Sequence, residues 1–437
     1  MNKKTLFQRG HFARWLHKVL YHISFIGGSV LLVACGGGGG GGDGGNDDDG
    51  GTTKPCNQWP EFTDLELPGN SEVTAVLVLN ECAVVVAGYD SSNYVGQSEG
   101  NSRGFIRRLD LNAADEVTEA WVYHLDSAGS DSVQTLQLDE NSILFTGYVG
   151  AALPGETSYG KKDAVVGRIS AAGELIKQSQ LGNEYPNIPI RVLQADSGEQ
   201  LLVGWDDIYI PTNFVDRWEN PWLAGISESN DQFTLDWMSN TNTEARDLYS
   251  AAALAGNTVL LGRFTGEGSP RGIAVEARSL TGTPLWTLPI TPFGYDSITD
   301  IQVLDEDYAL VMGSTYAQLG DSQFGGADYY LLQVLIATGE VVAASQYGSE
   351  QLEWAKKLLL DGDKRWLVGE RSEGNFPWEI DITLVAAGAE PISLRRTFGD
   401  STNVTDAALL GDGVLVGGYY RPDEVISAAY LAFINEG

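Results

Sequence analysis

The chain has 437 residues, of which 10% are aromatic and 53 are glycine, so it is long enough for one large or two ordinary domains and suits a turn-rich all-β protein. Its formal net charge is −32. Five of the 27 basic residues precede residue 35, where there are no acidic residues, so the remainder carries 22 basic and 59 acidic residues and a formal charge of −37. So negative a field argues against nucleic acid or an anionic membrane as a bound surface and is compatible with a cation or a basic partner.

The first 34 residues have the pattern of a secretory signal. A basic stretch is followed by an apolar run over residues 23–34, which is too short to span a bilayer comfortably. The run ends in Leu32-Val33-Ala34-Cys35, which resembles the bacterial lipobox. The resemblance implies a lipid on Cys35 and, because Gly36 follows, sorting to the outer membrane, with the protein facing the periplasm or the cell surface. The alternative is an ordinary signal peptide with a chance cysteine.

Residues 35–58 follow as a predicted tether. Gly36 to Lys54 is nearly all Gly, Asp and Asn, a composition that cannot offset its ordering entropy by burial. A phosphate-binding glycine loop is excluded because no strand precedes the segment, no helix follows it and aspartates fill it.

The repeating unit of the chain is clearest at residues 296–348. Four apolar or alternating runs, at 299–304, 308–313, 329–336 and 341–346, are separated by turn residues and predict a four-stranded antiparallel sheet. The same unit recurs every fifty to sixty residues or so, the range of β-propeller blades. A glycine closes the second strand of each copy: Gly88, Gly147, Gly204, Gly262, Gly313, Gly369 and Gly417.

The last copy stops after its third strand. The segment 61–67 supplies the missing strand, and pairing it with the last copy removes the exposed sheet edges. We therefore predict an all-β fold for residues 59–437, a seven-bladed β-propeller of four-stranded antiparallel blades closed by the N-terminal strand. The blades begin near residues 73, 131, 189, 246, 297, 352 and 403.

The repeats resemble bacterial seven-bladed β-propeller repeats of the SBBP type. The shared features are the second-strand glycine, the run Gly325-Gly326-Ala327-Asp328, the hairpin turns at Gly173 and Gly339, and the unit ends Leu181-Gly182, Tyr347-Gly348 and Phe398-Gly399. The resemblance implies the fold and no common activity, so it transfers no catalytic residue.

Two cysteines remain beyond the signal. Cys56 precedes the closing strand, and Cys82 lies in the turn after the first strand of blade one. In a four-stranded meander these two places lie on one face, so we expect a Cys56–Cys82 disulfide that pins the closing strand, worth about 3 kcal/mol. The alternative is two free thiols.

Residues suited to catalysis or metal binding are scarce. His124 is the only histidine after the signal, so a Ser-His-Asp triad is disfavoured and a multi-histidine metal site is impossible. Acidic turns such as Asp305-Glu306-Asp307 could attract calcium, but Asp and Gly are favoured there for backbone reasons alone. We expect no cofactor and no metal. Paired carboxylates could support polysaccharide hydrolysis, although the sequence does not single out a pair.

The loops between the second and third strands are long and rich in aromatic residues. Topology places all of them on one face of a propeller, where binding residues usually lie. The alternative is that these rings pack between blades. The candidate binding face comprises Tyr94, Tyr159, Trp205, Tyr209, Trp218, Trp222, Phe324, Trp378 and Tyr420.

The innermost strands offer a second candidate. Alignment on the acidic turns places Gln134, Arg191, Asp300, Lys356 and Asp406 in one ring with Ala75 and Ala251. This ring is either a small-ligand site or a solvated channel lining whose charges pair with one another, and the sequence favours the latter.

The expected function is a non-catalytic, outer-membrane-anchored propeller that binds a protein or polysaccharide partner through its aromatic loop face. We expect a monomer that contacts the membrane only through its lipid and binds no nucleic acid. The alternatives are an envelope enzyme that acts on polysaccharide by carboxylate catalysis and a structural or assembly factor at the outer membrane.

Overall fold

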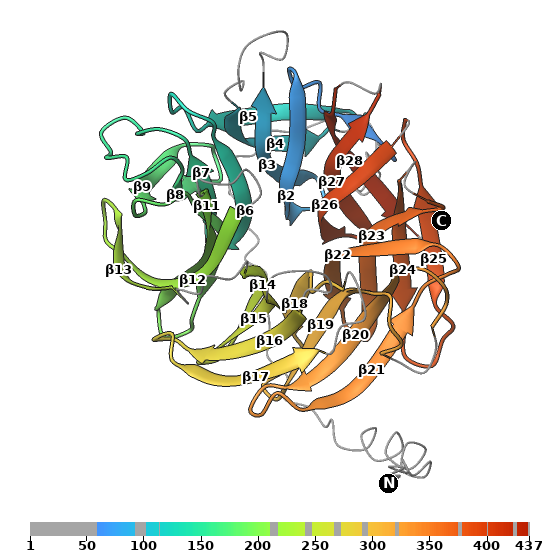
Figure 1. Cartoon of the computed structure of the whole chain (residues 1–437). Coiled ribbons are helices and arrows are strands. Elements are labelled where there is room, and N and C mark those ends of the chain that lie inside the picture. Colours follow the sequence, from blue (N-terminus) through green and yellow to red (C-terminus); the bar gives the residue numbers. More distant parts are fainter. Residues whose placement is uncertain are drawn as a thin grey trace, which may run out of the picture. The chain divides into compact units, whose positions relative to one another are not determined.

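The computed structural model describes residues 59–91, 102–112, 114–209, 217–240, 247–265, 272–290, 296–319, 323–374, 378–399, 401–422 and 426–435. These ranges contain 28 strands in seven four-stranded antiparallel sheets, which confirms the predicted fold. Figure 1 shows the sheets arranged radially around a centre, with the first strand of each blade innermost. None of the described residues belongs to a helix long and apolar enough to cross a membrane.

Blades one to four follow one another without crossovers. Blade one comprises β2 (Asn70–Asn80), β3 (Ala83–Ser91), β4 (Arg103–Leu111) and β5 (Val117–His124). Blade two comprises β6 (Ser132–Asp139), β7 (Ser142–Val149), β8 (Asp163–Ser170) and β9 (Leu175–Leu181). Blade three comprises β10 (Asn187–Gln194), β11 (Gln200–Tyr209), β12 (Arg217–Glu228) and β13 (Phe233–Asn240). Blade four comprises β14 (Leu248–Ala255), β15 (Thr258–Thr265), β16 (Gly272–Ser279) and β17 (Pro284–Ile290).

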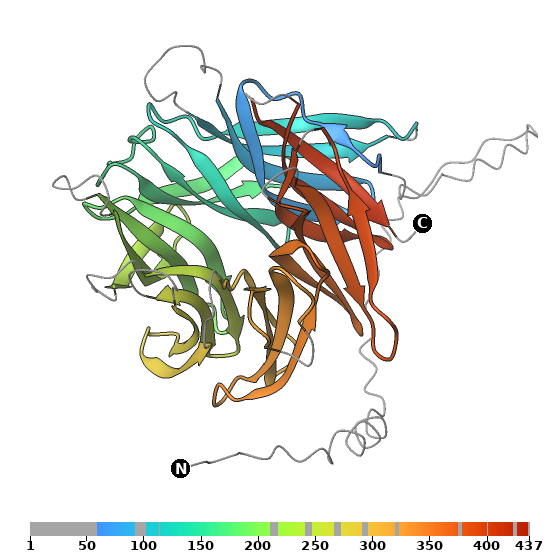
Figure 2. The same cartoon turned by 45° about the vertical axis from the view of Figure 1, so that its right-hand side comes forward.

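Blades five and six repeat the plan. Blade five comprises β18 (Asp300–Val303), β19 (Tyr308–Thr315), β20 (Asp328–Leu335) and β21 (Val341–Tyr347). Blade six comprises β22 (Leu352–Asp361), β23 (Lys364–Ser372), β24 (Glu379–Val385) and β25 (Ile392–Arg396). Figure 2 shows the twist of these sheets, which follows from the right-handed twist of each strand.

Blade seven is built from both ends of the chain. It combines β26 (Ser401–Leu410), β27 (Gly413–Arg421) and β28 (Ala428–Asn435) with β1 (Thr63–Asp64), which pairs with β28 through Thr63↔Leu431 and Asp64↔Tyr430. Phe62 packs against Phe398 with ring centroids 4.5 Å apart, and the Tyr420 hydroxyl donates to Asp64 Oδ2 at 2.5 Å. The ring is therefore closed by the N-terminal strand, as predicted.

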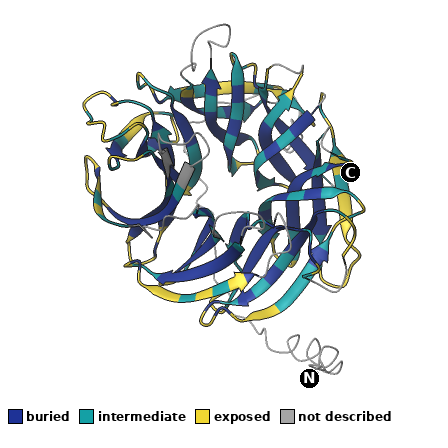
Figure 3. Cartoon of the chain, in the orientation of Figure 1, coloured by how far each residue is buried: buried dark blue, intermediate teal, exposed yellow. Residues whose placement is uncertain are grey.

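The hydrophobic core is divided among the junctions between blades. The described residues form seven buried clusters, and each cluster lies between two adjacent blades. Because neighbouring blades cover both faces of a sheet, the middle strands are buried along their length, as in β3, whereas the outer strands β5, β9 and β21 each leave some residues exposed. Figure 3 shows this change from buried inner strands to exposed outer strands. Each fully buried aliphatic side chain stabilises the ring by about 1.5–3 kcal/mol.

The glycine near the end of the second strand has a steric cause. A Cβ on Gly88 would lie 1.9 Å from the carbonyl oxygen of Glu72, and one on Gly313 would lie 1.8 Å from that of Ser297. In blade seven the residue crowded in this way is Gly418, one position after the predicted glycine. In blade four Arg263 takes the position, opposite Tyr249. Most blades therefore keep glycine because the first strand's backbone approaches too closely for a side chain.

Candidate functional site

The first strands of the blades form the inner wall of the ring, and most of them share one irregularity in their pairing with the second strand. In six of the seven described first strands a residue directly opposite the crowded end of the second strand has no partner across the hairpin, so the strand carries a β-bulge there, and β2 has a second one at Leu79. The unpaired residues of the shared bulge are Thr74, Gln134, Ile190, Ser250, Lys356 and Thr405. All six line one cavity of about 550 Å³, to which all seven blades contribute.

The predicted ring lies on this cavity. Its members Ala75, Gln134, Arg191, Ala251, Asp300, Lys356 and Asp406 all contribute to the wall. Their register needs a correction, because Gln134 and Lys356 are bulge residues, whereas Arg191 and Asp406 come one position after the bulge. The residues equivalent to Arg191 and Asp406 are Thr135 in blade two and Lys357 in blade six.

The charges of the wall are engaged with neighbouring blades. Asp406 pairs with Lys357 of blade six at 2.9 Å, and its Oδ2 accepts the backbone N–H of Val76 in blade one at 2.9 Å. Asp300 is buried, and its Oδ2 accepts the N–H of Leu358 in blade six at 3.1 Å. Arg191 lies 3.8 Å from Asp300. These contacts join blades and leave little of the ionic lining to a ligand.

The bulge hydroxyls join blades in a second way. Thr405 donates to the carbonyl of Val73 in blade one as well as to that of Gly417 in its own blade. Ser250 likewise donates to the carbonyl of Ile298 in blade five at 2.6 Å. The extra residue of the bulge thus places a hydroxyl where it links consecutive blades.

A group of residues that sequence reasoning did not bring together lies at the start of the first strands. Tyr89, Tyr148 and Tyr419 each directly follow the crowded glycine of blades one, two and seven and are half-buried. The Tyr89 hydroxyl donates to Glu72 Oε2 at 3.0 Å. Burial raises the pKa of Glu72, and burial followed by the charge of Glu72 raises the pKa of Tyr148 and of Tyr419. We call Glu72, Tyr89, Tyr148 and Tyr419 the mouth cluster. An aromatic residue directly after a repeat glycine was the signal that could have found it.

Two residues of the predicted aromatic face project into solvent. Tyr159 is 52% exposed and Phe324 is 42% exposed. Each stands four residues before a buried aspartate at the start of its blade's third strand. The Tyr159 N–H donates to Asp163 Oδ2 at 2.8 Å, and the Phe324 N–H donates to Asp328 Oδ2 at 3.0 Å.

The same two aspartates connect the loops to the fourth strand. Gln180 Nε2 donates to Asp163 at 2.7 Å, and Gln346 Nε2 donates to Asp328 at 2.8 Å. The Oε1 atom of each glutamine accepts a backbone N–H from the start of its loop, from Leu153 or Leu319, at 3.0 Å. Blades two and five therefore hold an exposed aromatic ring with the same buried Asp–Gln pair.

Two members of the predicted face are corrected by the structure. Trp222 is fully buried between blades two and three, because Gly204 beside it leaves room for the indole ring. Tyr420 packs against Phe62 at 5.2 Å and holds the closing strand through Asp64. Both residues serve packing. Trp205 and Trp378 are half-buried.

The remaining predicted residues lie wholly or partly outside the described part of the chain. Tyr209 and Trp218 lie on β11 and β12, so this segment is an extended hairpin where a long loop was expected, and their side chains lie outside the described part. Tyr94, Cys35 and Cys56 also lie outside the described residues. Cys82 is disulfide-bonded. Its pairing with Cys56 stays a prediction.

No protein-family model matches the chain, and no curated protein matches it. Its likeness is to solved structures. An ulvan lyase described as a new family of polysaccharide lyase is 10% identical with a TM-score of 0.50, over 86% of this chain and 96% of the lyase. The polysaccharide lyase Uly1 is 8% identical with a TM-score of 0.47, over 86% and 91%. An acylaminoacyl peptidase from Pyrococcus horikoshii is 7% identical with a TM-score of 0.47, over 84% of this chain and 52% of the peptidase. At these identities the likeness shows the fold alone.

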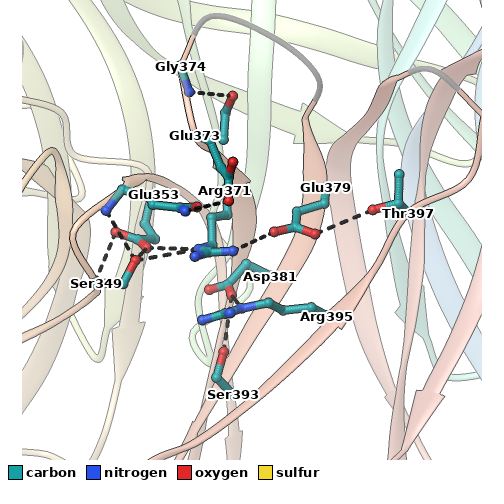
Figure 4. Close-up of polar contacts among 12 residues, drawn as sticks. Ser349, Glu353, Arg371, Glu373, Gly374, Glu379, Asp381, Ser393, Arg395 and Thr397 are labelled. Atoms are coloured by element: carbon teal, nitrogen blue, oxygen red, sulfur yellow. Dashed lines mark hydrogen bonds and ion pairs between the residues drawn. The ribbon is translucent and has the colours of Figure 1, made fainter.

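A group of carboxylates in blade six is paired with arginines and has a structural role. Figure 4 shows Arg371 between Glu353 and Glu379, at 3.4 and 2.7 Å, and Arg395 on Asp381 at 3.2 Å. Burial raises the pKa of Glu353 and of Asp381. Because arginines already occupy these carboxylates, they do not form an open acid–base pair.

Metal-ligating residues and His124 complete the description of the candidate sites. Within the described ranges no three His, Cys, Asp or Glu side chains gather as a metal site requires. His124 ends the outer strand β5, and burial, with a further contribution from Arg103, lowers its pKa.

Proposed function

We propose that this protein is a non-catalytic propeller, anchored to the outer membrane through Cys35, that binds a polysaccharide through its loop face. The observation that carries the proposal is the paired presentation of Tyr159 and Phe324, which are exposed while the loops behind them are held by buried Asp–Gln pairs. A loop whose backbone is already fixed loses little conformational entropy when its aromatic ring stacks on a sugar. The anchor rests on the sequence.

A polymer suits this arrangement better than a single small molecule. The two rings stand on blades two and five, which are not neighbours in the ring. One chain with repeating units can contact both rings, and the second contact is then intramolecular and raises the overall affinity. A protein partner would instead need one continuous surface with buried aromatic anchors.

The test is binding of the purified propeller to a panel of bacterial and algal polysaccharides. We expect Tyr159→Ala and Phe324→Ala each to weaken binding of the recognised polymer, and the double variant to lose about a hundredfold in apparent affinity. Leu285→Ala, which removes a 53% exposed side chain from the outer strand β17, is the matched control. Unchanged polymer binding by the double variant would remove the basis of the proposal, and capture of a protein instead would replace the ligand class.

An envelope enzyme that acts on polysaccharide is the second candidate. The observation that favours it is the hydrogen-bonded pair of Glu72 and Tyr89, because burial raises the pKa of both groups and a carboxyl group that holds its proton can act as a general acid. The fold shared with an ulvan lyase is compatible with this candidate. Release of new chain ends from any polymer of the panel, abolished by Glu72→Gln, would favour it over simple binding.

A further inference from the structure

The mouth cluster is assembled by the repeat itself. Glu72 pairs across the hairpin with Tyr89, Ser132 with Tyr148, and Asn403 with Tyr419, so the three tyrosines hold the same register in three consecutive blades. Glu72 lies two residues before Thr74, which lines the cavity, a separation of about 7 Å along the strand. The cluster therefore stands at the end of the cavity where the first strands begin.

The carboxylate of Glu72 lacks a close cation. It accepts the Tyr89 hydroxyl and makes no ion pair with any residue that the structure describes. The charge of Lys356 lowers the pKa of Glu72 in part, but Lys356 Nζ forms its ion pair with Glu370 Oε1, at 3.3 Å. Two carboxylates therefore share one ammonium group. Two other charges face the tyrosines: Arg421 lowers the pKa of Tyr419 in part, and Asp131 raises the pKa of Tyr148. Partial burial without a paired cation disfavours the charged form of Glu72, and a ligand that brings a cation would favour it again.

The tyrosines supply a complementary surface. The faces of aromatic rings attract cations. Lys162 Nζ already lies 4.4 Å from the centre of the Tyr148 ring, whereas no cation of the described residues lies over the ring of Tyr89 or Tyr419. The chain's formal net charge of −32 adds a negative potential that focuses on clefts. A bulky, weakly hydrated cation loses less hydration than a metal ion when it enters such a site.

We propose that the mouth cluster binds an organic ammonium group, a quaternary or alkylated amine held between the Glu72 carboxylate and the rings of Tyr89 and Tyr419. Neither a sugar contact at Tyr159 nor catalysis is needed for this site. It is therefore independent of the proposed polysaccharide binding.

The experiment compares choline with 3,3-dimethylbutan-1-ol, in which carbon replaces the charged nitrogen at equal shape. Calorimetry on the purified propeller should show binding of choline at millimolar concentrations and at least about tenfold weaker binding of the neutral alcohol. Equal binding of both compounds, or no binding of choline, overturns the proposal.

Variants separate the charge from the rings. Glu72→Gln keeps the shape and should weaken choline binding about tenfold, and Tyr419→Ala should weaken it while Tyr419→Phe, which keeps the ring, should not. Tyr159→Ala is the control and should leave choline binding unchanged, which also separates this site from the polysaccharide site. Choline binding should fall as acid protonates Glu72, whose pKa is raised. An unaffected Glu72→Gln variant would contradict the site, and circular dichroism of each variant checks that it is folded.

Discussion

The inner wall of the ring and the loops of blades two and five contain the same type of hydrogen bond, but it stabilises different parts of the molecule. In both places a carboxylate accepts a backbone N–H. At the wall the partner belongs to the next blade, as with Asp406 and Val76, whereas in the loops it belongs to the same blade, as with Asp328 and Phe324. The wall contacts therefore stabilise the ring as a whole, and the loop contacts position side chains that the ring does not need for folding.

The largest effect should come from Asp406→Ala at the closing junction. It leaves Lys357 and the N–H of Val76 without their partner in the wall, so we expect the free energy of unfolding to fall by about 3 kcal/mol. Urea unfolding measures the change. Asp412→Ala, in the exposed turn of the same blade, should change stability by less than about 0.5 kcal/mol. Equal losses in the two variants would show that the wall carboxylate does not hold the blades together.

A smaller and more local effect should follow from Asp328→Ala. It removes the acceptor for the Phe324 N–H and for Gln346, so we expect a loss of about 1–2 kcal/mol, faster proteolysis of the loop before β20, and polymer binding as weak as in Phe324→Ala. Asp328→Asn keeps one acceptor oxygen and should recover part of the binding. If Asp328→Ala destabilised the ring as much as Asp406→Ala, the distinction between wall and loop would fail.

The smallest effect should come from Tyr420→Phe, which removes only the hydrogen bond to Asp64 and should cost about 1 kcal/mol near neutral pH. Burial and the neighbouring Asp64 raise the pKa of Tyr420 to about 12. Because the folded pKa is the higher one, this contribution is complete below the ordinary value of 10.0 and is lost as pH rises through about 12. Unfolding of both proteins at neutral and alkaline pH tests this, with Tyr159→Phe as the exposed control.

The fold could be predicted because its signals are local and repeated. Turn residues and the second-strand glycine mark every blade, and the third strand that ends the chain requires the closing strand at residues 61–67. The register of the wall could not be predicted in full. A bulge adds one residue without any residue type that marks it, so counting back from the acidic turn placed Gln134 and Lys356 one position away from Arg191.

The aromatic face was predicted less well, because exposure depends on what packs against each ring. Trp222 and Tyr159 both stand near the start of a third strand in the sequence. Gly204 leaves room for the ring of Trp222 in the core, whereas Asp163 fixes only the backbone of Tyr159, whose ring is exposed. The mouth cluster was missed for a different reason. Its tyrosines stand far apart in the chain, and only the ring brings the same register position of blades seven, one and two together.

The closing strand has a consequence for the order in which the chain folds. Six blades can each form from one contiguous stretch, but the seventh needs Thr63–Asp64 together with the last strand of the chain, Ala428–Asn435. At the pace of ribosomal synthesis the early strand waits on the order of tens of seconds for this partner. A chain truncated before β28 would leave β1 and β27 with unpaired edges, which invite aggregation and degradation. Closure of the ring therefore requires that β28 has been synthesised.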